Sequence, residues 1–138
     1  MFGRKKKTAR QNLESIVNQR LMEAAKPILE NVSKVMSYYR CAMMEVETKL
    51  NVLNEEFSLR YDRTPITDIK TRLKRLDSIR EKLERDDLPV TIESMEENLS
   101  DIAGVRVICS FPEDVYMVAD ALLSQDDVTL IRKKDYIA

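Results

Sequence analysis

The sequence has 138 residues, 43% hydrophobic and 34% charged, and its 23 basic and 24 acidic side chains leave a net charge of −1. This composition predicts a soluble globular domain or part of one, and the balanced charge argues against general nucleic-acid binding. Histidine is absent and the only glycines are Gly3 and Gly104, which excludes Ser-His and Cys-His catalysis, imidazole metal sites and glycine-rich phosphate loops. A nucleotide site in this chain would have to hold phosphates with lysine, arginine and helix ends.

The cysteines and the N-terminus indicate a cellular compartment. Cys41 and Cys109 lie far apart and outside any C-x-x-C pair, which favours buried thiols in a reducing compartment over a disulfide. Residues 4–7 are basic, but no apolar segment of a signal peptide follows them, and no apolar run approaches membrane-spanning length. We therefore expect a cytoplasmic protein without a membrane partner.

Apolar residues in the N-terminal part recur at steps of three and four, the spacing of one helix face. A short stripe runs from Leu13 to Leu21, and Pro27 is expected to begin a second helix. The second stripe, called here the seam, consists of Leu29, Val32, Met36, Tyr39, Met43, Val46, Leu50, Leu53 and Phe57. The seam suits either the flank of an enzyme core or a coiled coil. The alternative to an enzyme is therefore a helical interaction protein, and we expect a homo-oligomer formed through these helices.

After Thr64-Pro65 the pattern changes from helical to mixed. Ser78 with Glu81, and Ser110 with Glu113, form capping-box patterns that predict a helix start at each serine. The expected elements are an extended segment at 66–74, helices at 78–85 and 92–99, a strand at 105–109, a helix from Ser110 to Leu123 and a strand at 128–132. This order predicts an α+β (α/β-like) class, with long N-terminal helices packed on a small mixed sheet.

A first candidate site is basic. In an extended segment Arg72 and Lys74 point to the same face, and Lys82 stands one helical turn after Ser78. Three cations and a helix N-terminus could thus converge on one anion. The alternative is a solvated face with ion pairs along the helix.

A second candidate site surrounds Asp101, which lies where a helix gives way to a strand. Gly104 follows, as if the backbone needed an unusual dihedral angle or a close approach there. Arg106 lies inside an apolar strand and should find a carboxylate, a ligand or the edge of the sheet. Asp101 would suit Mg²⁺ shared with phosphate oxygens, and the alternative is a buried ion pair between Arg106 and an aspartate.

These residues resemble the synthetase domain of RelA/SpoT-type enzymes, in particular the small alarmone synthetases. The resemblance is carried by Asp101 to Tyr116, which read D-I-A-G-V-R-V-I-C-S-F-P-E-D-V-Y, and by the closing K-D-Y-I that begins at Lys134. The segment from Arg72 to Lys82 is similar to the family's ATP motif, R-x-K-x-x-x-S-I-x-x-K. The resemblance covers residues 64–138. It implies a nucleotidyltransferase-like catalytic core at 64–138 after a helical region at 1–63.

The resemblance also implies an activity, GTP pyrophosphokinase, which transfers pyrophosphate from ATP to the 3′-hydroxyl of GTP or GDP and yields (p)ppGpp. It makes Asp101 the catalytic residue and the ligand of Mg²⁺, and it directs Lys134 toward the phosphates of GTP or GDP. The remaining site residues would bind ATP. Arg72 and Arg106 would stack on the adenine, and Lys74 and Lys82 would hold the phosphates. Ser78 would lie beside these phosphates at the start of the helix.

The chain departs from the family pattern at Tyr136-Ile137-Ala138, where it stops. Family members continue there through a P-K-x-x-G-Y-x-S-x-H-like segment whose tyrosine stacks on guanine, and a more distal glutamate completes the Mg²⁺ site. We therefore expect the sequence to be the N-terminal part of a synthetase, with a core incomplete at its C-terminus. On its own it should make no product.

Overall fold

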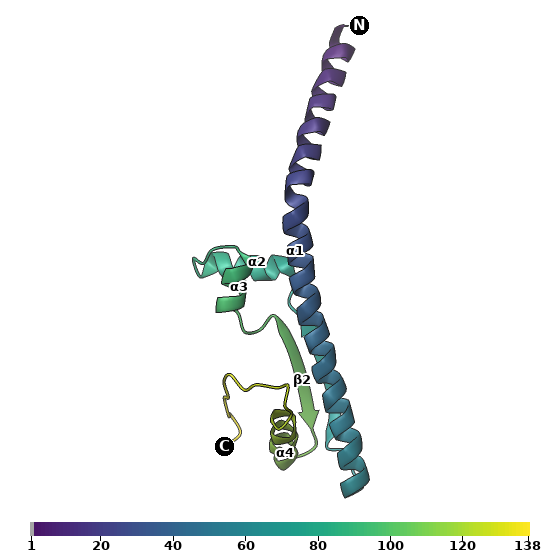
Figure 1. Cartoon of the computed structure of the whole chain (residues 1–138), viewed down its shortest axis with the longest axis vertical. Helices are drawn as coiled ribbons and strands as arrows, with labels where there is room; N and C mark the ends of the chain where they lie inside the picture. The colour runs from purple at the N-terminus through teal and green to yellow at the C-terminus, as the bar shows by residue number, and fades with distance from the viewer. Residues whose placement is uncertain (1) are drawn as a thin grey trace. The chain divides into compact units, whose positions relative to one another are not determined.

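The computed structural model describes residues 2–138, with side chains from Thr8 onward (Figure 1). The first helix, α1 (Phe2–Tyr61), runs through two compact units, one ending at Tyr38 and the other comprising Tyr39–Ala138. The remaining elements belong to the second unit: β1 (Ile66–Leu73), α2 (Leu76–Arg85), α3 (Ile92–Asn98), β2 (Ala103–Cys109) and α4 (Pro112–Leu123). The predicted α+β class is confirmed.

The prediction of two N-terminal helices was wrong, because Pro27 lies inside α1. A proline within a helix removes one hydrogen bond and costs about 3 kcal/mol. The residues before it include Ala24 and Ala25, and Leu29 follows closely, so strong helix formers on both sides keep the chain helical. Within the first unit the apolar stripe is exposed, with Leu13 66% and Leu21 63% accessible.

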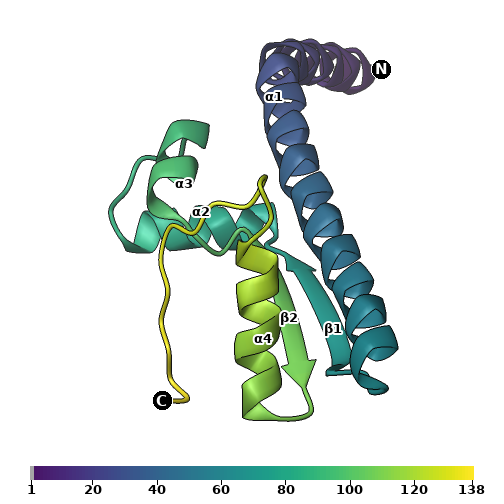
Figure 2. The same cartoon turned by 60° about the horizontal axis from the view of Figure 1, so that its bottom comes forward.

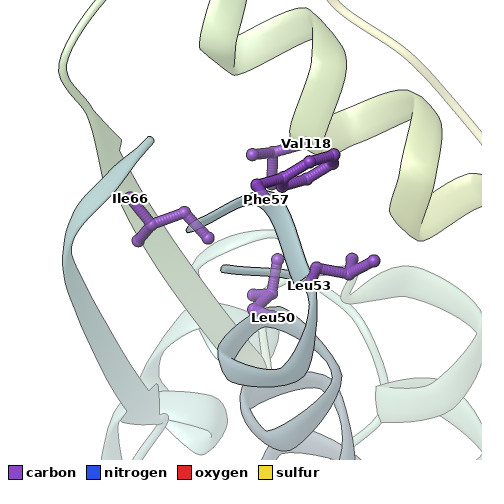
Figure 3. Close-up of a cluster of buried hydrophobic side chains, with 5 residues drawn as sticks. All are labelled: Leu50, Leu53, Phe57, Ile66 and Val118. Carbon is purple, nitrogen blue, oxygen red and sulfur yellow. The ribbon is translucent and has the colours of Figure 1, made fainter. Parts of the chain in front are cut away.

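The end of the seam forms part of the core of the second unit. Leu50 is 1% exposed, and Leu53 and Phe57 are also buried. Figure 3 shows these three side chains beside Ile66 of β1 and Val118 of α4. The C-terminal part of α1 and helix α4 therefore share a core with one face of the sheet, whose strands lie next to α4 in Figure 2.

The sheet described here has two antiparallel strands, with Arg72 opposite Gly104 and Lys70 opposite Arg106. Side chains of β2 alternate between half-buried and exposed, which is the pattern of a sheet covered on one side. The uncovered side, called here the open face, carries Asp68, Lys70, Arg72, Gly104, Arg106 and Ile108. The end of the seam and α4 pack on the other side, which leaves the open face accessible to a ligand.

Both capping-box predictions were wrong. Helix α2 begins at Leu76, and its N-cap is Arg75, which has extended backbone angles and no capping side chain. In α4 the N-cap is Phe111, and Pro112 occupies the first turn, where its missing N–H costs nothing. The N–H of Ser110 donates to the carbonyl of Pro65 at 3.0 Å. Ser110 therefore extends the backbone hydrogen bonding between the end of β2 and the start of β1.

Two further expectations need correction. Residues 128–132 lie in irregular structure after α4, where Figure 2 draws no arrow, and Ile131 is 96% exposed. Among the described residues this segment has no neighbouring strand to pair with, so β propensity alone does not make it one. Both cysteines are free, as predicted, but Cys41 is exposed and only Cys109 is half-buried. No helix in the described part of the chain has the length and apolar character needed to cross a membrane.

Candidate functional site

Three elements bring one carboxylate and two ammonium groups together. Lys74 follows β1, and its backbone N–H donates to the carbonyl of Ile102 at 2.7 Å, which fixes it beside the start of β2. Its side-chain Nζ donates to Asp101 Oδ2 at 2.9 Å. Lys82 Nζ, from α2, lies 3.4 Å from Asp101 Oδ1. We call Lys74, Lys82 and Asp101 the charged cluster.

The charged cluster is held in place by buried apolar residues that neighbour Lys82 and Asp101 in the sequence. Ile79 and Leu83 of α2, on either side of Lys82 along the helix, are 4% and 1% exposed. Leu99 and Ile102 flank Asp101 and are also buried. The loop before β2 is therefore anchored on both sides of the aspartate, which fixes the distance between its carboxylate and α2.

The electrostatics of the charged cluster leave it with an excess of one positive charge. The hydrogen bond from Lys74 holds the pKa of Asp101 below its ordinary value, against a smaller effect of burial. The carboxylate is thus ionised at neutral pH and pairs with both lysines. Its side chain is 53% exposed, and pairs at such surfaces contribute about 0–1 kcal/mol to stability. The cluster is therefore weak as a structural tie and open to an anion.

The charged cluster opens onto the open face of the sheet. A hollow of about 270 Å³ is lined by Arg72, Lys74, Asp101 and Gly104. Arg72 and Lys74 thus reach the same hollow, as their spacing predicted, although Lys74 lies one residue beyond the strand. A second hollow of about 640 Å³ continues along the strands and reaches Arg106.

Arg72 and Arg106 are diagonal neighbours on the open face. Arg72 stands opposite Gly104, two residues before Arg106, and diagonal positions in an antiparallel pair are about 7–8 Å apart. A flat ring in contact with a guanidinium on each side needs about 7 Å, twice an ordinary contact distance. Within the described part of the chain neither arginine makes an ion pair or hydrogen bond. The alternative of a buried Arg106–aspartate pair was wrong, because Arg106 is exposed and Asp101 pairs with lysines.

Gly104 has a different role from the one its position indicated. Its backbone does not have a positive φ, and an added Cβ would meet only the carbonyl oxygen of Arg72, at 3.9 Å. Neither an unusual dihedral angle nor a close approach requires glycine here. The absence of a side chain leaves free space between Arg72 and Arg106, where both hollows meet.

Two predicted residues stand apart from the charged cluster. Ser78 is the third residue of α2, half-buried and one turn before Lys82, so it shares that helix face without capping the helix. Lys134 is exposed in the segment after α4, and in the described structure it makes no hydrogen bond or ion pair with the charged cluster.

The sequence did not reveal an ion pair that ties the loop before β1 to α4. Asp114 is 1% exposed, and its oxygens accept from both terminal nitrogens of Arg63 at 2.8 and 2.5 Å. The Arg63 guanidinium also lies 5.6 Å from the centre of the Phe111 ring. The bonds from Arg63 lower the pKa of Asp114. A signal was available, since Asp114 precedes Val118 by four residues on the buried face of α4.

The metal-binding capacity of the site rests on Asp101. No group of three or more histidine, cysteine, aspartate or glutamate side chains comes together in the described residues. A single carboxylate beside two lysines fits Mg²⁺ only where a bound ligand, such as a nucleotide's phosphates, supplies further oxygen ligands, which is how proteins commonly hold this ion.

Comparison with known proteins identifies the family. Residues 71–138 match the family described as "Region found in RelA / SpoT proteins". The chain belongs to the RelA/SpoT family. It is 35% identical over 116 residues to the GTP pyrophosphokinase YwaC of Bacillus subtilis, covering 84% of this chain and 55% of YwaC. It is 36% identical over 101 residues to YjbM of the same organism, also a GTP pyrophosphokinase, covering 72% and 46%. The chain thus spans about half the length of these curated relatives.

Solved structures of small alarmone synthetases and of a GTP pyrophosphokinase family protein share the fold. Small alarmone synthetase 1 from B. subtilis, bound to its product pppGpp, superposes with a TM-score of 0.68 at 30% identity, over 78% of this chain and 55% of that one. The same synthetase bound to AMPCPP gives 0.66 at 30% identity, over 78% and 56%. A GTP pyrophosphokinase family protein from Streptococcus pneumoniae gives 0.67 at 32% identity, over 76% and 51%.

Proposed function

We propose that this chain forms the ATP-binding part of a GTP pyrophosphokinase, which transfers pyrophosphate from ATP to the 3′-hydroxyl of GTP or GDP to give (p)ppGpp. The observation that carries the proposal is the charged cluster of Lys74, Lys82 and Asp101, open to the hollow beside Arg72. The curated relatives are GTP pyrophosphokinases, and one matched synthetase structure holds AMPCPP, an ATP analogue. A cytoplasmic location is proposed with this function.

ATP would bind along the open face. Arg72 and Arg106 are spaced to stack on either side of the adenine ring, with the free space at Gly104 between them. The phosphates would then lie over the charged cluster, where Lys74 and Lys82 exchange Asp101 for phosphate oxygens. Ser78, on the Lys82 side of α2, supplies a hydroxyl near the same phosphates.

Mg²⁺ is the cofactor that this arrangement favours. When bound, the ion would neutralise phosphate charge during transfer. Asp101 is the residue that would hold it, since its carboxylate is freed when the two lysines turn to the phosphates. Transfer of this kind depends on positioning and charge neutralisation rather than covalent help from the protein, which suits a chain without histidine.

The guanine nucleotide requires further residues. Lys134 is proposed to bind its phosphates. The family's glycine-tyrosine-histidine segment is not among the 138 residues, which contain no histidine and only Gly3 and Gly104 as glycines. We propose that a polypeptide of these residues binds ATP without forming (p)ppGpp.

Charge reversal at Lys82 tests the proposed function. Lys82→Glu removes one charge-assisted phosphate contact, worth about 1.5–3 kcal/mol, so ATP affinity should fall roughly 10- to 150-fold. Titration calorimetry of the 138-residue chain with ATP and Mg²⁺ measures this change.

The matched control is Arg80→Glu, because Arg80 lies on the same helix, points away from the face of Lys82 and is 62% exposed. The control should bind ATP like the unmodified chain and should melt at a similar temperature. Equal affinity for Lys82→Glu and Arg80→Glu would show that the phosphates do not bind at the charged cluster.

We also propose that the chain forms a homo-oligomer through its first unit. Leu13, Ile16, Val17 and Leu21 are each at least 51% exposed and lie along one side of the helix. Such a stripe is covered most simply by the same stripe of another copy. Sedimentation equilibrium should give a mass above that of one chain, and Leu21→Lys should lower it. A monomer at micromolar concentration would contradict this proposal.

A further inference from the structure

The segment after α4 carries Lys134 but has no regular structure of its own. It is largely exposed, with Ile131 96% and Tyr136 87% accessible. Apolar packing therefore cannot be what fixes this segment. An ion pair between Lys49 Nζ of α1 and Asp127 Oδ2, at 2.9 Å, holds the start of the segment, and separate polar contacts hold its end.

Those contacts centre on Asp135. The hydroxyl of Tyr116, on α4, donates to its carboxylate at 2.9 and 3.1 Å. The backbone N–H groups of Ile137 and Ala138 also donate to Asp135 Oδ1, at 2.9 and 3.2 Å. Both carboxylate oxygens are therefore engaged by the protein itself. Among the described residues, Tyr116 is the one that bonds Asp135 from outside the segment.

We propose that Tyr116 and Asp135 form a latch that positions Lys134, so that Tyr116 is a positioning residue for the guanine nucleotide. This inference rests on the proposed function of Lys134. Asp135 follows Lys134 directly, and fixing its carboxylate restricts the backbone on both sides of the peptide bond that joins them. Because its oxygens are occupied, Asp135 acts on Lys134 rather than on a ligand.

Helix α4 is a rigid base for this latch. Val118 and Asp114 lie two residues to either side of Tyr116 and are 4% and 1% exposed. Tyrosine loses little side-chain entropy when ordered, since it has few rotatable bonds. The same hydrogen bond raises the pKa of Tyr116, while the backbone bonds from Ile137 lower the pKa of Asp135. The donor is thus protonated and the acceptor ionised across the neutral range.

The direct test removes one hydroxyl. Tyr116→Phe should loosen the backbone at the bonds after Lys133 and Lys134, so trypsin should cut there about three- to tenfold faster, as expected for the loss of one hydrogen bond of typical net strength at an exposed site. Tyr136→Phe is the matched control, because it makes the same change in an 87% exposed tyrosine and should leave cleavage unchanged. Equal cleavage of the two variants would overturn the latch.

The nucleotide measurement separates the latch from the proposed function. Isotope-labelled chain is titrated with millimolar GDP and followed by nuclear magnetic resonance. Lys134→Ala and Tyr116→Phe should each lower the affinity for GDP. The double variant should bind GDP as well as Lys134→Ala does, because both changes act through Lys134. The affinity for ATP should be unchanged in all three variants.

Two results would be decisive against the inference. If Lys134→Ala weakens GDP binding and Tyr116→Phe does not, the proposed function stands and the positioning role is overturned. If Lys134→Ala leaves GDP binding unchanged while Tyr116→Phe still accelerates trypsin, the proposed function of Lys134 fails, and the positioning role falls with it.

Discussion

Replacing Asp101 with asparagine is expected to reduce pyrophosphate transfer to background in a polypeptide that joins these residues to the family's guanosine-binding segment. The substitution keeps the size of the side chain but removes the charge that would hold Mg²⁺ against the phosphates. The melting temperature should stay close to that of the unmodified protein, because the exposed pairs with Lys74 and Lys82 contribute about 0–1 kcal/mol.

Calorimetry of the Asp101→Asn variant should show opposite effects on ATP affinity without and with Mg²⁺. Without Mg²⁺ the variant should bind ATP at least as tightly as the unmodified chain, because a carboxylate next to the phosphates has been removed. With Mg²⁺ its affinity should no longer rise. Asp68→Asn is the control, because it makes the same change at another aspartate of the open face. Asp68 Oδ2 also lies near a lysine, 3.8 Å from Lys70 Nζ. Normal transfer by Asp101→Asn, or a loss shared with Asp68→Asn, would rule out the metal role.

Replacing Leu50 with alanine is expected to lower the free energy of unfolding by about 2–5 kcal/mol, the range measured for buried leucines. Leu50 is 1% exposed and packs with Leu53, Phe57, Ile66 and Val118, so the deleted atoms leave a cavity between α1, the sheet and α4. Urea denaturation followed by circular dichroism measures the change.

Leu59→Ala serves as the control for Leu50→Ala. It is the same substitution in the same helix, but Leu59 is 87% exposed, so stability should change little. The comparison also separates the two interpretations of the seam. If Leu50→Ala left stability unchanged and altered only self-association, the end of the seam would serve an interface rather than the core.

The sequence predicted those elements whose formation depends on local pattern. The short helix near residues 92–99 and the strand ending at Cys109 were expected and are present as α3 and β2. Helix starts were less predictable, because capping needs extended backbone at the capping residue as well as a suitable side chain. Arg75 and Phe111 have that backbone, and Ser78 and Ser110 do not serve as caps.

The charged cluster could be predicted only in part. A period of two placed Arg72 and Lys74 together, and both line one hollow. The partner of Lys74 was not predictable, since Asp101 lies 27 residues away and reaches it through a loop anchored by Leu99 and Ile102. The bond between Arg63 and Asp114 spans 51 residues and depends in the same way on tertiary packing.

The pairing of Asp101 with two lysines means that the site carries its own counter-ion. A simple anion such as sulfate would gain contact with Lys74 and Lys82 only by leaving an uncompensated carboxylate beside itself. A nucleotide that arrives with a divalent cation satisfies both signs of charge at once. In the proposed function, the site would therefore discriminate against bare anions by repulsion as well as select metal-loaded phosphates by attraction.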